Sequence, residues 1–181
     1  QKHIALSMEG MKLLGYQKAE KQKLCMELPI VKAKMTESKA KRSHEIYEYL
    51  EPKGAKPQKG AFLLLLAPHG GKIEVGTDAI VRAIAESKAL CGKTTLWMCQ
   101  AYGKSGVYKR WHITSTDLSP RSFPKLAIVA DVKGGFKHAL AIHGHRGNTI
   151  LIGGAGAMAI KQNIKRALDA AKLGAPVKIQ K

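Results

Sequence analysis

The stretch AFLLLLAPHGGKIEVGTDAI, residues 61–80, decides the fold class of this chain. Residues 61–67 are all apolar, which predicts a strand that is buried on both faces. A glycine pair follows that allows a tight backbone turn, and residues 77–87 then carry the apolar spacing of a helix. A buried strand that leads through a turn into a helix is the building unit of an α/β sheet, so we expect that fold class.

The chain beyond residue 90 continues this alternation of strand-like and helix-like segments. We expect strands at residues 94–100, 126–130, 139–142 and 149–152, a helix at about 155–173 that ends at Gly174, and the beginning of another strand in residues 175–181. This order of elements supports an α/β sheet rather than an all-α or all-β fold.

The first 60 residues have a different composition. Residues 1–50 are rich in Lys, Glu, Met and Leu, which predicts two helices broken near Pro29, and the second helix includes the apolar residues between 46 and 50. The stretch EPKGAKPQKG that follows holds two prolines and two glycines among charges and predicts a linker. We therefore divide the chain into a Lys-rich helical segment with its linker, 1–60, and an α/β domain, 61–181.

The overall composition indicates a globular chain with a large positive charge. Of the 181 residues, 45% are hydrophobic and 24% are charged, which argues against disordered, collagen-like and coiled-coil classes. Three scattered cysteines are too few for a disulfide framework, and the longest apolar run is too short to span a membrane. The net charge of +18 predicts attraction to a polyanion. With 6% aromatic residues and no recognisable basic helix or stacking platform, nucleic-acid binding is the less favoured alternative.

Histidine and glutamate side chains follow two of the predicted strands. His69 and Glu74 come at the end of the apolar strand, and His143 comes directly after the strand at 139–142. Ligand sites of open α/β sheets lie at such strand ends, and two His with one Glu form a zinc set that leaves one position open for water. A histidine in this position is also common as a loop or core residue, so spacing alone leaves both interpretations open.

Two further histidines are candidates for the same site. His145 is a lesser candidate for a ligand, because an extended backbone would place it on the same face as His143. His112, between Trp111 and Ile113, could be a rival third ligand, a substrate contact or a hydrogen-bonded core histidine.

Three motifs carry a resemblance to a known family. The stretches PHGGKIEVGTDAI (68–80), WHITSTDLSP (111–120) and AIHGHRGNTILIGG (141–154) resemble, in the same order, motifs of the phage-type poly-γ-glutamate hydrolases. The resemblance spans about residues 62–175. It implies a zinc-dependent enzyme with a carboxypeptidase-like, three-layer α/β fold around a mixed, twisted sheet.

The resemblance also implies an activity and a ligand set. The family hydrolyses the γ-amide links of poly-γ-glutamate, and by that resemblance His69, Glu74 and His143 are the zinc ligands. Poly-γ-glutamate is a capsule or biofilm polymer, so action outside the producing cell is implied. The implied partner is poly-γ-glutamate or another acidic polymer, and no membrane is expected to take part.

One residue of the family pattern is missing. The family has a catalytic glutamate on a later strand, in a Leu-Glu-like context, whereas the acidic residue after His143 in this chain is Asp169, which we expect on a solvated helix face. Either the chain lacks the C-terminal part of the enzyme or it is an inactive relative, and we favour the first interpretation. Activity of these 181 residues is therefore in doubt.

Three arginines lie within or beside the matched motifs. Arg110, Arg121 and Arg146 could form bidentate pairs with carboxylates of an acidic polymer, and they could equally be solvated surface residues. Together with His112 they form the predicted substrate-binding set.

Overall fold

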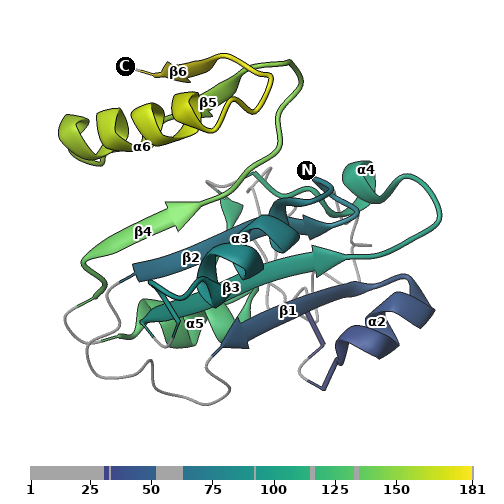
Figure 1. Ribbon diagram of the computed structural model, residues 1–181. Coiled ribbons are helices and arrows are strands. Elements are labelled where there is room, and N and C mark those ends of the chain that lie inside the picture. The colour runs from purple at the N-terminus through teal and green to yellow at the C-terminus, as the bar shows by residue number, and fades with distance from the viewer. Residues whose placement is uncertain are drawn as a thin grey trace, which may run out of the picture.

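Strands and helices alternate along the chain, as the sequence predicts for an α/β fold (Figure 1). The computed structural model describes residues 31–32, 34–51, 63–91, 93–114, 117–132 and 135–180. The elements in chain order are α2 (Glu37–Ser43), β1 (Ile46–Glu51), β2 (Leu63–Gly71), α3 (Thr77–Glu86), β3 (Thr94–Ala101), α4 (Val107–Trp111), α5 (Pro124–Ala130), β4 (His138–Ala141), β5 (Ile150–Ile152), α6 (Met158–Ala170) and β6 (Val177–Ile179).

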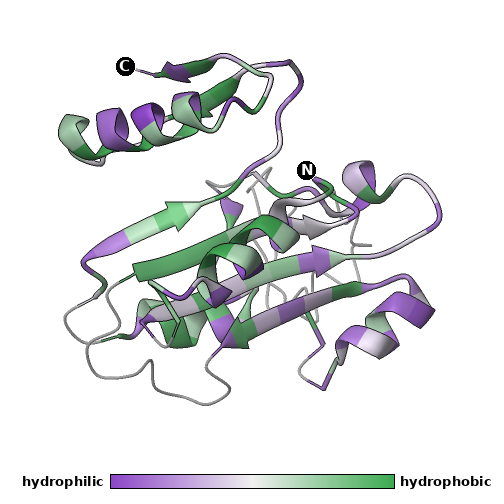
Figure 2. Ribbon diagram, viewed as in Figure 1, coloured by the Kyte–Doolittle hydropathy of each residue, from purple (hydrophilic) through white to green (hydrophobic). Residues whose placement is uncertain are grey.

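The apolar strand β2 lies inside a four-stranded sheet of order β1-β3-β2-β4. It runs parallel to both of its neighbours, β3 and β4, while β1 runs antiparallel to β3, so the sheet is mixed as expected. Figure 2 shows the first part of β2 as continuously hydrophobic. Parallel strands need cover on both faces, which explains why this strand is a continuous apolar run rather than an alternating one.

Side chains on the two faces of the sheet enter two separate cores. Leu64 of β2 packs in a core with Val129 of α5, whereas the next residue, Leu65, packs in a second core with Val81 of α3. Successive side chains of a strand point to opposite faces, so α3 and α5 cover opposite faces of the sheet. The sheet is therefore the middle of three layers, as the resemblance implies.

Strand β1 corrects one expectation from the sequence. It pairs with β3 from Ile46↔Ala101 to Glu51↔Leu96, so the helix predicted over residues 46–50 is wrong. Every second residue of β1 is buried, which is the period of a strand with one covered face. β1 thus joins the sheet across the division that we drew near residue 60. The predicted helix before Pro29 and most of the predicted linker lie outside the described residues.

Helix α5 corrects a second expectation. The apolar residues 126–130 were predicted to form a strand, but they lie in a helix that begins at Pro124. The N–H groups of Lys125 and Leu126 at its first turn donate to the carboxylate of Glu48, at 2.9 and 2.6 Å. A proline in the first turn and an acceptor for the free N–H groups both favour a helix start. The acceptor comes from β1, so the sequence around residues 124–130 does not predict this helix start.

The C-terminal elements form a second, smaller sheet. Strands β5 and β6 pair in parallel from Ile150↔Val177 to Ile152↔Ile179, and α6 connects them. The strand expected in the last residues is thus present and finds its partner in β5. Figure 1 shows this β5–α6–β6 unit beside the four-stranded sheet, joined to β4 through residues 142–149.

The helices of the described residues are short or amphipathic. None of them has the combined length and apolar character that crossing a membrane requires.

The buried carboxylate of Glu48 generates a stability prediction. Glu48 is 2% exposed and also accepts a hydrogen bond from the Trp97 indole at 2.7 Å, so Glu48→Ala leaves three donors without their acceptor. We expect it to lower the free energy of unfolding by about 2–4 kcal/mol in urea denaturation. The control is Glu45→Ala, whose partner Lys32 is mostly exposed, with an expected loss of roughly 0–1 kcal/mol. Equal losses in the two variants would contradict the role of Glu48.

Candidate metal centre

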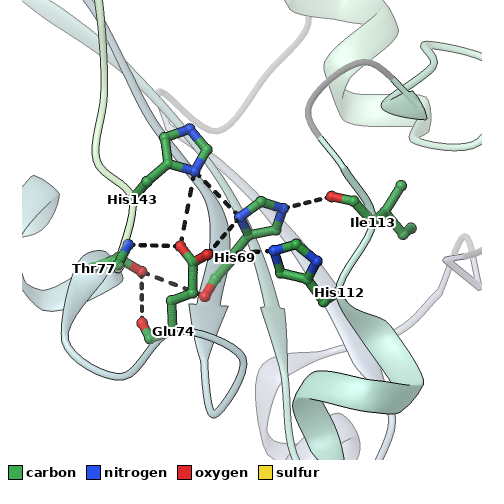
Figure 3. A network of polar contacts seen from close by, with 7 residues as sticks. His69, Glu74, Thr77, His112, Ile113 and His143 are labelled. Carbon is green, nitrogen blue, oxygen red and sulfur yellow. Dashed lines mark hydrogen bonds and ion pairs between the residues drawn. The ribbon is translucent and has the colours of Figure 1, made fainter. Parts of the chain in front are cut away.

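His69 lies on a β-bulge at the end of β2. Strands β2 and β3 pair in step as far as Ala67↔Met98, and the next pair is Gly70↔Gln100, so β2 holds one extra residue between them. Bulges bend a strand and re-aim its side chains. His69 is buried, with 2% of the residue exposed, and its side chain faces Glu74 (Figure 3).

The two glycines after His69 are required by close packing. Gly71 has φ +68°, and a Cβ atom there would lie 2.5 Å from the carbonyl oxygen of Ala101. At Gly70 a Cβ atom would lie 2.9 Å from the Cβ of Asp78. Because neither glycine carries a side chain, the backbone can turn tightly enough for the Glu74 N–H to donate to the His69 carbonyl at 2.8 Å. The turn brings the imidazole and the carboxylate together, at 3.3 Å between His69 Nδ1 and Glu74 Oε1.

His143 reaches the same point from β4. Since β4 is parallel to β2, the carboxyl ends of both strands meet at one edge of the sheet. The Ile142 N–H donates to the Leu66 carbonyl at 2.9 Å, which extends the pairing up to the residue before His143. The Nδ1 atom of His143 then lies 3.3 Å from His69 Nδ1 and 3.8 Å from Glu74 Oε2 (Figure 3).

The spacing of these three side chains suits one metal ion. A tetrahedral zinc ion with bonds of about 2.0–2.1 Å holds its ligand atoms about 3.3–3.4 Å apart. The Nδ1 atoms of His69 and His143 lie 3.3 Å apart, His69 Nδ1 lies 3.3 Å from Glu74 Oε1, and His143 Nδ1 lies 3.8 Å from Glu74 Oε2. With one ligand atom from each residue, the three atoms lie within 4.8 Å of one another. The residues present therefore fit a small divalent ion.

The surroundings of His69 and His143 favour ring nitrogens with a lone pair that can bind a metal. His69 Nε2–H donates to the carbonyl of Ile113 at 2.6 Å, so in the neutral tautomer with this hydrogen bond the unprotonated Nδ1 faces Glu74 and His143. A carbonyl on the far nitrogen is the usual partner of a metal-binding histidine. Burial lowers the pKa of His143, and His69 and His112 lower it further against the opposing charge of Glu74. The neutral, ligating form of His143 is thereby favoured.

His112 lies beside this group. It follows α4, whose last turn holds it through a bond from the His112 N–H to the Tyr108 carbonyl at 2.9 Å. Its Nε2 is 3.4 Å from Glu74 Oε1, and its ring stacks between Tyr108 and His69, with centroid distances of 4.3 and 4.2 Å. The group of three ligand atoms does not include His112, and its side chain remains 21% exposed.

The other predicted residues lie further out. His145 is exposed and its ring nitrogens contact the backbone oxygens of Arg146, at 3.0 Å, and Thr149. Arg110, Arg121 and Arg146 are exposed, and the Arg110 guanidinium packs 4.8 Å from the Trp111 ring centroid. Substrate binding by the three arginines stays a prediction.

Two contacts of the site were not foreseen. The Ile113 carbonyl orients His69, and the Gly144 N–H donates to Glu74. Both act through backbone atoms, which any residue possesses, so the residue type at Ile113 carries no signal. A glycine directly after a candidate ligand, as at Gly144, is a usable signal of close approach.

Comparison with known proteins assigns the family. A model of the poly-gamma-glutamate hydrolases matches residues 36–181. The chain belongs to the poly-γ-glutamate hydrolase family. The match begins at α2 and includes β1, both of which precede the motifs quoted above.

A solved structure supports the fold. A bacteriophage poly-gamma-glutamate hydrolase aligns with a TM-score of 0.56 and 21% sequence identity, over 75% of this chain and 57% of that chain. The two proteins share a fold, and this chain spans little more than half the length of the phage protein. A comparison with curated proteins finds no match.

The geometry predicts metal binding that depends on His143 and not on His145. Protein purified without chelator is expected to hold about one divalent ion per chain, as for a mononuclear site, and His143→Ala is expected to lose it because one of the three ligands is removed. His145→Ala is the matched control and should retain the ion, since its ring faces its own loop. The measurement is elemental analysis after gel filtration. Metal retained in full by His143→Ala would show that His143 is not a ligand.

Proposed function

We propose that this protein is a zinc-dependent hydrolase of γ-glutamyl amide bonds in poly-γ-glutamate. The observation that carries the proposal is the convergence of His69, Glu74 and His143 at the carboxyl edge of the sheet, in a chain of the poly-γ-glutamate hydrolase family. Two imidazoles and one carboxylate are a donor set of catalytic zinc. Zinc bound there would supply a polarised scissile carbonyl and a water that ionises near neutral pH.

The side chains of His69, Glu74 and His143 are proposed to have different roles at the metal centre. His69 and His143 would present imidazole nitrogens to the ion, and Glu74 would supply negative charge that offsets part of the charge of a divalent ion. The burial of His69 and Glu74, at 3% and 10% side-chain exposure, limits the access of bulk water to these ligands. The more exposed His143, at 37%, marks the side from which a polymer would approach.

His112 is proposed to contact the substrate. Its ring is held by stacking against Tyr108 and His69, while the side chain stays partly exposed beside Glu74. A ring held in this way can donate a hydrogen bond to an oxygen of the scissile amide without a large loss of side-chain entropy. This role makes His112 a donor near the reacting atoms rather than a third histidine ligand.

The positive charge of the chain suits an acidic polymer. Residues 61–181 hold 18 basic and 6 acidic residues, a net charge of +12, so most of the excess lies on the part of the chain that carries the site. Arg110, Arg121 and Arg146 are proposed to pair with α-carboxylates along poly-γ-glutamate. The field of such a surface raises the encounter rate with a polyanion and weakens with added salt.

Asp169 is not proposed as the proton acceptor of the reaction. Asp169, the acidic residue after His143, bonds to Lys165 at 2.7 Å on the exposed side of α6, as expected for a solvated helix residue.

The proposal predicts metal-dependent release of amines from poly-γ-glutamate. Incubation of the polymer with the zinc-loaded protein should raise the free amine concentration and shorten the polymer, at a rate above that of His143→Ala and of chelated protein. His112→Ala should keep its metal and lower the rate by roughly 10²–10³-fold, the effect of removing a transition-state hydrogen-bond donor. Amine release that is equal with and without chelator would refute a zinc hydrolase.

Polymer binding separates this function from nucleic-acid binding. Affinity for poly-γ-glutamate should exceed affinity for single-stranded DNA of similar charge, and the difference should persist as salt weakens both interactions. The comparison is a fluorescence anisotropy titration at several salt concentrations. Equal affinities with equal salt slopes would indicate a general polyanion binder.

A further inference from the structure

The carboxylate of Glu74 has its shortest described contact with a backbone group. The Gly144 N–H donates to Glu74 Oε2 at 2.8 Å, whereas the imidazoles of His69, His112 and His143 lie 3.3–3.8 Å from the carboxylate oxygens. A hydrogen bond to an ionised carboxylate is stronger than a neutral one. The Gly144 bond is thus the contact that is best suited to fix the rotation of the carboxylate.

Residue 144 also has little room for a side chain. A Cβ atom on Gly144 would lie 3.1 Å from Glu74 Cβ, which is closer than ordinary van der Waals contact, and 3.4 Å from Glu74 Cγ. The φ angle of Gly144 is not among the positive ones, so the need for glycine is one of space and not of backbone strain. An alanine there would push the loop and Glu74 apart by a few tenths of an ångström and lengthen the hydrogen bond.

We propose that Gly144 is a positioning residue for the metal centre, which holds the Glu74 carboxylate in its ligating orientation through its backbone N–H and its lack of a side chain. The inference rests on the proposed metal centre. Glu74 reaches the site through a side chain with three rotatable bonds, and fixing it before metal arrives avoids an entropy loss on binding. The loop after β4 therefore supplies both the ligand His143 and the group that orients the ligand Glu74.

The hydrogen bond itself can be tested without metal. In the metal-free protein, hydrogen exchange followed by NMR should show a protected Gly144 amide although the residue is exposed. Glu74→Ala should abolish this protection and leave that of Lys72 unchanged, because the Lys72 N–H donates to the Ala101 carbonyl. A Gly144 amide that exchanges at the same rate in both proteins would overturn the proposal.

Metal affinity then tests the positioning role. Zinc titrations against a chromophoric chelator should show Gly144→Ala binding about 10–100-fold more weakly than the unchanged chain, the usual effect of losing an outer partner of a metal ligand. The matched control is Gly156→Ala, where a Cβ atom meets nothing within 4 Å and the φ angle is not positive. Gly156→Ala should bind zinc like the unchanged chain, and thermal unfolding of the metal-free variants should be alike.

The outcomes separate this inference from the proposed function. Unchanged zinc affinity in Gly144→Ala, while His143→Ala loses its metal, would overturn the positioning role and leave the metal centre intact. A metal-free Gly144→Ala protein that unfolds well below the Gly156→Ala control would show a merely structural role. An unchanged chain that binds no zinc would refute the metal centre and the positioning role together.

Discussion

The parallel pairing of β2 with β4 is the constraint on which the site depends. It places the carboxyl ends of both strands at one edge of the sheet, so a ligand that follows β4 meets ligands that follow β2. The bulge before Gly70 and the absence of a side chain at Gly71 then turn the end of β2 toward that meeting point. His69 and His143 are 74 residues apart in sequence, and the pairing of β2 with β4 is what brings their side chains together.

The fold could be predicted from sequence where a segment's own residues determine its structure. β2 and α3 were predicted because a continuous apolar run and a helical apolar spacing are local signals. β1 and α5 were predicted wrongly because each depends on a distant partner. β3 supplies the hydrogen bonds that make a strand of Ile46–Glu51, and Glu48 supplies the acceptor that begins α5 at Pro124.

The candidate site divides in a similar way. His69, Glu74 and His143 could be selected because their side chains have metal-binding chemistry and follow strands, and the structure brings these three together. His145 has the same chemistry, but its ring nitrogens contact backbone oxygens of its own loop. The spacing of the residues in the sequence could not predict these contacts. The Ile113 carbonyl could not be predicted at all, because backbone groups are the same at every residue.

Residues 142–149 connect two separately hydrogen-bonded sheets, and His143 lies at the start of this connection. Occupation of the site would therefore restrain one end of the tether that carries the β5–α6–β6 unit. If metal binding orders this tether, thermodynamic reciprocity requires that a contact which orders the tether strengthens metal binding by the same free energy. Cofactor uptake and the orientation of the C-terminal unit would in that case be one coupled equilibrium rather than two independent events.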